Sequence, residues 1–173
     1  KTHVLEYKSD ILSIAENEYV TSITGEDGNF TVTTDKNSYT SKTVLITTGS
    51  SRKKLTVPGA SEFENKGITY CASCDGPLFS GMDVVVVGGG NAGFESAAQL
   101  LAYCTSVTLL SRSEPKADAI TIAKLQQKEH FKLITNAAPK EIKGSVFVES
   151  ITYTKTDTNE DITLPTSAVF VEI

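Results

Sequence analysis

Two cysteines of this 173-residue chain, Cys71 and Cys74, are separated by two residues. This spacing suits a redox-active dithiol, and it also supplies half of a zinc site. A zinc site would need two further ligands, and the chain offers only isolated candidates, namely Cys104, His3 and His130. The spacing therefore favours a redox-active pair, and Cys104 is predicted to be a buried or half-buried cysteine at a helix end.

A glycine-rich turn follows four consecutive valines, Val84 to Val87. The valines predict a buried strand, and Gly88, Gly90 and Gly93 have the G-x-G-x-x-G spacing of a dinucleotide-binding turn. Gly88 would permit the tight turn, Gly90 would let a pyrophosphate approach the backbone, and Gly93 would let the next helix pack closely on its strand. The first amides of that helix would face the phosphates. The residues expected at this cofactor site are Gly88, Gly89, Gly90, Asn91, Ala92 and Gly93.

The residues around the turn predict a complete βαβ unit. An amphipathic helix is expected from about Asn91, and a second strand is expected over residues 107–110. The alternative is a glycine-rich loop that binds nothing, but the strand before it and the helix after it favour a nucleotide site. Beyond this unit we expect a helix over 118–129, a strand over 131–135, a hairpin of 145–155 with 161–164, and a final strand over 168–173.

The end of the second strand bears on which nicotinamide nucleotide is bound. An acidic residue at this place is typical of NAD sites, and a basic residue accommodates the 2′-phosphate of NADP. The chain has Ser111, Arg112 and Lys116 there. These residues favour NADPH, with NADH as the alternative. Arg112 and Lys116 could also be charged residues of a solvated loop.

The first 54 residues predict an antiparallel β-meander, because short strand-forming runs alternate with turn residues. Its strands are expected at 10–14, 19–24, 30–34 and 44–47. A linker over 55–65 would lead to a second domain over 66–173, where strands and helices alternate. The predicted fold class is therefore α/β, with a Rossmann-like, three-layer nicotinamide-binding domain and an antiparallel β-meander.

Two segments resemble a known family. Residues 66–79, with Tyr-Cys-x-x-Cys-Asp-Gly-Pro-Leu-Phe, and residues 84–93 resemble the central region of low-molecular-weight thioredoxin reductases. In sequence, these two segments resemble the flavoprotein subunit of alkyl hydroperoxide reductase even more closely. That protein belongs to the same pyridine nucleotide-disulfide oxidoreductase family. Residues 44–50 and 168–173 resemble two further family segments. The resemblance implies that the meander is part of a FAD domain, whose main FAD-binding motifs are not in this sequence.

The resemblance also implies a reaction and a role for each site residue. Electrons would pass from NAD(P)H through FAD to the Cys71–Cys74 disulfide, and on to a thioredoxin-like protein or a peroxidase-linked redox module. Cys74 would face the flavin, Cys71 would attack the partner, and Asp75 would serve the dithiol as acid-base group, although it could also cap the turn that follows it. Thr48 and Gly49 would pass near the flavin. Relatives are homodimers, so a homodimer is expected.

Composition and charge exclude other classes of function. The net charge of −5 and the dispersed basic residues argue against nucleic-acid binding. No apolar run approaches the roughly 18 residues that a membrane span needs, and the first residues show no signal-peptide pattern. We therefore expect a cytoplasmic protein that does not enter the membrane. A nicotinamide-binding module without flavin or turnover is the second interpretation.

Overall fold

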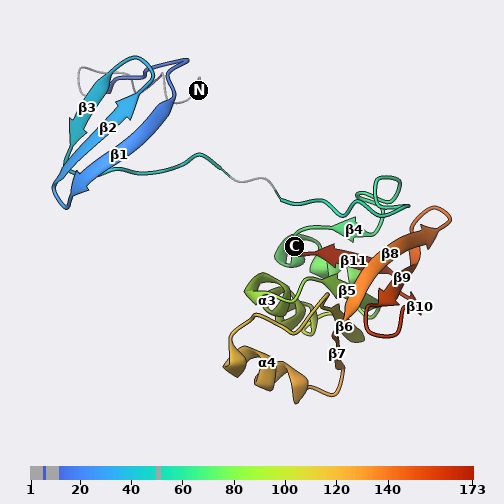
Figure 1. Ribbon diagram of the computed structural model, residues 1–173. Coiled ribbons are helices and arrows are strands. Elements are labelled where there is room, and N and C mark those ends of the chain that lie inside the picture. The colour runs from blue at the N-terminus through green and yellow to red at the C-terminus, as the bar shows by residue number, and fades with distance from the viewer. Residues whose placement is uncertain (1–5, 7–11, 50–51) are drawn as a thin grey trace. The chain divides into compact units, whose positions relative to one another are not determined.

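The structure is a computed structural model that describes residue 6, residues 12–49 and residues 52–173 (Figure 1). The chain divides into two compact units, Lys1–Ser50 and Ser51–Ile173. Among the described residues, no helix is long and apolar enough to cross a membrane.

The first unit contains a three-stranded antiparallel sheet in the order β1-β2-β3. Its strands are β1 (Val20–Glu26), β2 (Asn29–Thr34) and β3 (Ser38–Ser41). Glu18 fastens one end of this sheet, because its Oε1 accepts hydrogen bonds from the hydroxyls of Thr34 at 2.6 Å and Tyr39 at 2.9 Å. The bond from Thr34 is the main reason that the pKa of Glu18 is lowered. The predicted antiparallel meander is therefore confirmed.

Two of the predicted strands of this unit differ from the structure. Asp10 and Ile11 lie outside the described residues, and residues 12–14 and 44–47 form no strand. Leu45 and Ile46 are 87% and 66% exposed. Their apolar side chains therefore do not mark a buried strand, although the sequence indicated a strand here. The third strand is instead β3, in a polar segment for which the sequence predicted no strand. A strand needs a partner with which to exchange hydrogen bonds, and β2 supplies it there.

The second unit is built on a five-stranded parallel sheet with the order β4-β11-β5-β6-β7. The strands are β4 (Ile68–Thr69), β5 (Asp83–Val87), β6 (Ser106–Leu110), β7 (Phe131–Ile134) and β11 (Ala168–Val171). Continuous apolar runs such as the four valines of β5 are typical of parallel strands that are buried on both faces. The last strand of the chain, β11, lies between β4 and β5.

Each face of this sheet has its own hydrophobic core. Helices α3 (Asn91–Leu100) and α4 (Ala119–Gln126) cover one face, where Val86 and Phe170 pack with Phe94 and Leu100. A three-stranded antiparallel sheet covers the other face (Figure 1). Its strands are β8 (Ala137–Gly144), β9 (Val148–Lys155) and β10 (Glu160–Pro165). The predicted three-layer α/β architecture is confirmed.

The antiparallel sheet includes one strand, β8, that the sequence did not predict. Pro139 and the terminal Gly144 argue against a strand in this segment. However, β8 lies at the edge of its sheet, and its register shifts between Pro139 and Glu141. Edge strands and bulges are the places where a sheet tolerates proline. Ala60 and Phe63, in the segment expected as a linker, are buried in the same core. This segment therefore packs as part of the second unit.

Candidate functional site

Four neighbouring parallel strands of the second unit end along one edge of the sheet. In the order β4, β11, β5 and β6, they are followed by the dithiol segment, Glu172, the glycine turn and the loop that begins at Ser111. Ligands of open α/β sheets bind at this carboxyl edge, where the strand order reverses. The fold therefore brings the dithiol and the glycine turn to one edge, with a single strand between them.

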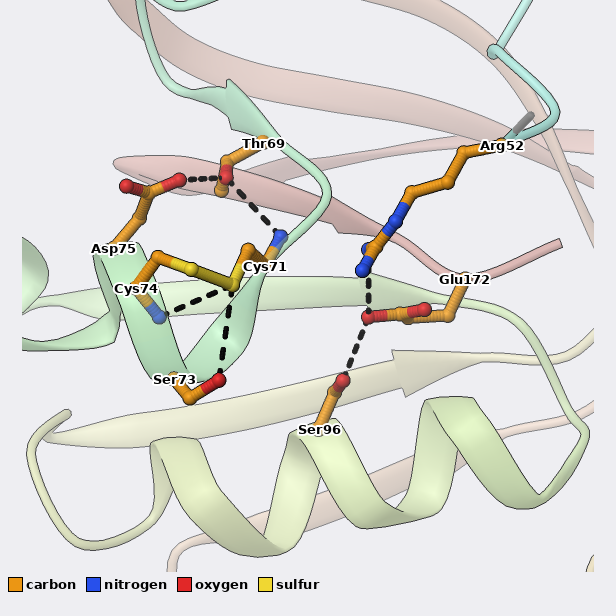
Figure 2. The surroundings of a disulfide bond; sticks show 8 residues. All are labelled: Arg52, Thr69, Cys71, Ser73, Cys74, Asp75, Ser96 and Glu172. Carbon is orange, nitrogen blue, oxygen red and sulfur yellow. Dashed lines mark hydrogen bonds and ion pairs between the residues drawn. A yellow bond between two sulfur atoms is a disulfide. The ribbon is translucent and has the colours of Figure 1, made fainter. Parts of the chain in front are cut away.

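The dithiol pair is present as a disulfide at the start of a short helix. Cys71 and Cys74 are bonded, with 5.3 Å between their Cα atoms, and helix α2 (Ala72–Asp75) begins directly after Cys71. Cys71 Sγ accepts a hydrogen bond from the Cys74 amide at 3.2 Å and lies 3.7 Å from the Ser73 hydroxyl (Figure 2). In the disulfide, Cys71 Sγ is therefore the sulfur that a backbone amide donor reaches.

Asp75 is held by a residue that the sequence did not single out. The hydroxyl of Thr69, at the end of β4, donates a hydrogen bond to Asp75 Oδ2 (Figure 2). Thr69 is buried, and its Oγ1 also accepts the Cys71 amide at 3.4 Å. Asp75 precedes the 3-10 helix η1 (Gly76–Phe79), but among the described residues its side chain makes no capping bond to η1. The carboxylate is thus oriented by β4 rather than by the turn.

The three glycines of the turn meet different requirements. Gly88 has φ of 144°, and a Cβ there would overlap the carbonyl oxygen of Glu172. A Cβ on Gly93 would overlap the carbonyl oxygen of Gly88, so the helix can approach the turn only without it. Gly90 has an ordinary extended backbone, with φ of −92°, and a Cβ there would meet no heavy atom within 4 Å. The fold itself therefore does not require glycine at position 90. The space that a Cβ would occupy there is open, and a ligand could use it.

The loop after β6 is tied to the glycine turn through its backbone. The amide of Lys116 donates to the carbonyl oxygen of Gly89 at 2.8 Å. Ser111 is buried, its hydroxyl donates to the carbonyl oxygen of Ser113 at 2.7 Å, and a Cβ on Gly89 would overlap that hydroxyl. The Ser111 hydroxyl is therefore already used as a donor within the loop.

Asn91 and Ala92, at the start of α3, differ in what they contact. Asn91 Oδ1 accepts the amide of Asp118 at 2.8 Å, which ties the start of α3 to the start of α4. Ala92 lines a small cavity beside Cys71. The side-chain oxygen of Asn91 is therefore already used as an acceptor within the protein.

A groove of about 680 Å³ lies in front of the glycine turn. Its wall includes Gly88 to Gly90, Arg112, and two cations that the sequence did not suggest, Lys53 and Lys54. Lys54 Nζ donates to Glu64 Oε1 at 2.5 Å. The groove has the size of a small-molecule site, and Arg112 and Lys53 on its wall suit phosphate groups.

A smaller cavity of about 200 Å³ lies beside Cys71 and Ser73. Glu172 lines both this cavity and the groove. Glu172 Oε1 accepts a hydrogen bond from the Ser96 hydroxyl at 2.7 Å and lies 3.8 Å from Nη1 of Arg52 (Figure 2). One signal in the sequence could have indicated Glu172, since it is the single acidic residue in the apolar segment 168–173.

Thr48 and Gly49 belong to the first unit, where they are exposed and lie outside any strand. They are therefore not among the residues that the parallel sheet brings together. Cys104 lies in the core beneath α3, where it is 8% exposed, as the sequence predicted.

Residues 2–173 match the family model of the pyridine nucleotide-disulphide oxidoreductases. This chain belongs to that family. Among the oxidoreductases of this family, an NADH dehydrogenase of Bacillus subtilis (strain 168) is 43% identical over 134 residues, which are 77% of this chain and 26% of the relative. An alkyl hydroperoxide reductase subunit from Staphylococcus epidermidis is 36% identical over 173 residues, 99% of this chain and 34% of the relative.

The solved structures include thioredoxin reductases with the same fold. The enzyme of T. acidophilum superposes with a TM-score of 0.72 at 33% identity, covering 99% of this chain and 56% of that structure. The predicted resemblance to thioredoxin reductases and to the alkyl hydroperoxide reductase flavoprotein is thus confirmed. The chain spans about a quarter to a third of the length of these curated relatives and about half of the solved enzyme.

Proposed function

We propose that this chain is the dithiol-bearing and nicotinamide-binding part of a flavoprotein disulfide reductase. Electrons would pass from NAD(P)H through FAD to the Cys71–Cys74 disulfide, and then to a thioredoxin-like protein or a peroxidase-linked redox module. The observation that most directly supports this proposal is that the disulfide and the glycine turn lie on one sheet edge, with only β11 between them. Bound flavin supplies the two-electron transfer between nucleotide and disulfide.

The protein's own residues would carry out the exchange with the partner. Two electrons and two protons convert the disulfide into two thiols, and the Cys71 thiolate then attacks the partner's disulfide. Cys74 next attacks the mixed disulfide, which releases the partner as a dithiol and restores the Cys71–Cys74 bond. The hydrogen bond from the Cys74 amide to Cys71 Sγ supports Cys71 as the attacking sulfur. Asp75, fixed by Thr69, would accept and return the thiol proton.

Trapping of the mixed disulfide tests these roles. With Cys74→Ser the second step is blocked, so the reduced chain should accumulate a covalent adduct with a thioredoxin that keeps only its attacked cysteine. That cysteine is supplied as a mixed disulfide with a small aromatic thiol, which leaves when Cys71 attacks, and the adduct is separable on a non-reducing gel. Cys71→Ser is the matched control and should give no such adduct, because its remaining thiol lacks the amide donor. An adduct with Cys71→Ser alone would reverse the assignment. No adduct with either variant, also when an oxidised peroxidase-linked module is offered, would favour a nicotinamide-binding module without turnover.

For the nucleotide we propose NADPH, with NADH as the alternative. Arg112 and Lys53 on the groove wall support a 2′-phosphate, whereas one relative is named an NADH dehydrogenase. The chain should then bind 2′,5′-ADP more tightly than 5′-ADP, and Arg112→Gln should remove most of that difference. Equal affinity for the two fragments in the unaltered chain would instead indicate NADH. A cytoplasmic location and a homodimer stay predictions of the sequence.

A further inference from the structure

Glu172 is placed where the nucleotide groove and the dithiol cavity adjoin. It lines both, and no other residue is common to the two walls among the residues that the structure describes. Its amide donates to the carbonyl oxygen of Val87 at 2.8 Å, directly before the glycine turn. Glu172 therefore stands on the side of the turn that faces the dithiol.

The carboxylate of Glu172 is largely withdrawn from water. Its side chain is 13% exposed, whereas that of its ion-pair partner Arg52 is 55% exposed. The Ser96 hydroxyl fixes one carboxylate oxygen at 2.7 Å, and the Arg52 contact of 3.8 Å is long for a hydrogen-bonded pair. Because Arg52 is exposed to solvent and its contact with the carboxylate is long, Arg52 offsets the charge of Glu172 only in part. Glu95 also lines the dithiol cavity and adds charge of the same sign.

The strand order indicates which half of a bound dinucleotide would meet Glu172. The glycine turn at the end of β5 is the expected pyrophosphate site, and the loop after β6, with Arg112, is the expected site of the adenosine ribose. Since β11 lies on the opposite side of β5 from β6, the nicotinamide half extends toward the end of β11. Glu172 is the first residue after β11.

We propose that Glu172 is a specificity-determining residue for the redox state of the nicotinamide, an inference that rests on the proposed function. The oxidised nicotinamide ring carries a positive charge, and the reduced ring is neutral. A fixed carboxylate beside the ring binds the oxidised form more tightly than the reduced form. Arg52, as the counter-charge of that carboxylate, limits this preference.

The test measures the affinity of the 173-residue chain for both redox forms of the nucleotide. The reduced form is titrated by its own fluorescence, and the oxidised form by its displacement of the reduced one. Glu172→Gln keeps an oxygen for Ser96 and removes the charge, so it should weaken binding of the oxidised form about fivefold relative to the reduced form. Arg52→Gln should change the ratio in the opposite direction, by about twofold. Glu141→Gln removes a partly exposed carboxylate that pairs with Lys143 and lines neither cavity, and it should leave the ratio unchanged.

Titration with 5′-ADP separates the possible failures. If the unaltered chain binds neither a nicotinamide nucleotide nor 5′-ADP, the proposed function is wrong, and this inference fails with it. If Glu172→Gln binds 5′-ADP normally but keeps the ratio of the unaltered chain, only the inference is overturned. If Glu172→Gln loses affinity for 5′-ADP as well, the Arg52→Gln variant becomes the test of the inference. An unchanged ratio of oxidised-form to reduced-form affinity in Arg52→Gln then overturns the inference.

Discussion

The hydroxyl of Thr69 donates a hydrogen bond to Oδ2 of Asp75, and so a buried residue of β4 holds the carboxylate next to the Cys71–Cys74 disulfide (Figure 2). The same oxygen of Thr69 accepts the Cys71 amide at 3.4 Å. One side chain therefore fixes both the start of the dithiol segment and the group proposed to move its proton.

Thr69→Val should slow thiol-disulfide exchange by the reduced chain about tenfold, because the Asp75 carboxylate then loses the hydrogen bond that fixes it beside the dithiol segment. Thr69→Ser keeps the hydroxyl and should stay within about twofold of the unaltered chain. The measurement is the rate of exchange with a small disulfide as a function of pH. Thr108→Val makes the same change in β6, away from the dithiol, and is the control. A Thr69→Val profile that matches that of the unaltered chain would show that Thr69 has no such role.

Gly93→Ala should destabilise the second unit by about 2 kcal/mol, because the added methyl would overlap the Gly88 carbonyl oxygen in a packed turn. Gly90→Ala is the matched control in the same turn. Its methyl would meet no heavy atom within 4 Å, so its free energy of unfolding should change by less than about 1 kcal/mol. Denaturant unfolding of both variants checks the pair. Equal stability of the two would contradict the close approach of α3 to the turn.

Cys104 should resist thiol reagents as long as the chain is folded. Burial raises the pKa of its thiol, and the charge of Asp83 raises the pKa further. A raised pKa leaves less thiolate at a given pH, and only the thiolate reacts. At pH 8 the reduced chain should therefore show two fast thiols, Cys71 and Cys74, and a third that reacts only in denaturant. Cys104→Ala should remove the third alone, whereas three equally fast thiols would disprove the burial.

Local signals in the sequence predicted the elements that carry their own pattern. The four valines of β5, the glycine spacing and the helix after it lie within one short stretch, and the structure has them there. β3 and β8 were not predicted, because each is a strand through its pairing with β2 or β9 rather than through an apolar pattern. In the same way, the exposed apolar residues at 44–47 predicted a strand that has no partner among the described ones.

Some residues of the candidate site could be predicted from local sequence patterns, and others could not. Cys71, Cys74 and the glycine turn are visible as short motifs, since each acts through neighbours in sequence. Glu172 and Thr69 are not visible in this way, because they reach the site only when β11 lies between β4 and β5. Arg52 and Lys53 lie in the stretch that the sequence predicted to belong to the meander, but the structure includes them in the second unit, where they line the two cavities.

The central claim is that the open space before the glycine turn receives a nicotinamide nucleotide. The most direct test is fluorescence titration of the chain with NADPH and, separately, with NADH, for the unaltered chain and for Gly90→Ala. The account predicts saturable binding of at least one nucleotide by the unaltered chain, and affinity at least about tenfold weaker in a Gly90→Ala chain that is still folded. Absence of binding by the unaltered chain, or equal binding by Gly90→Ala, would contradict it.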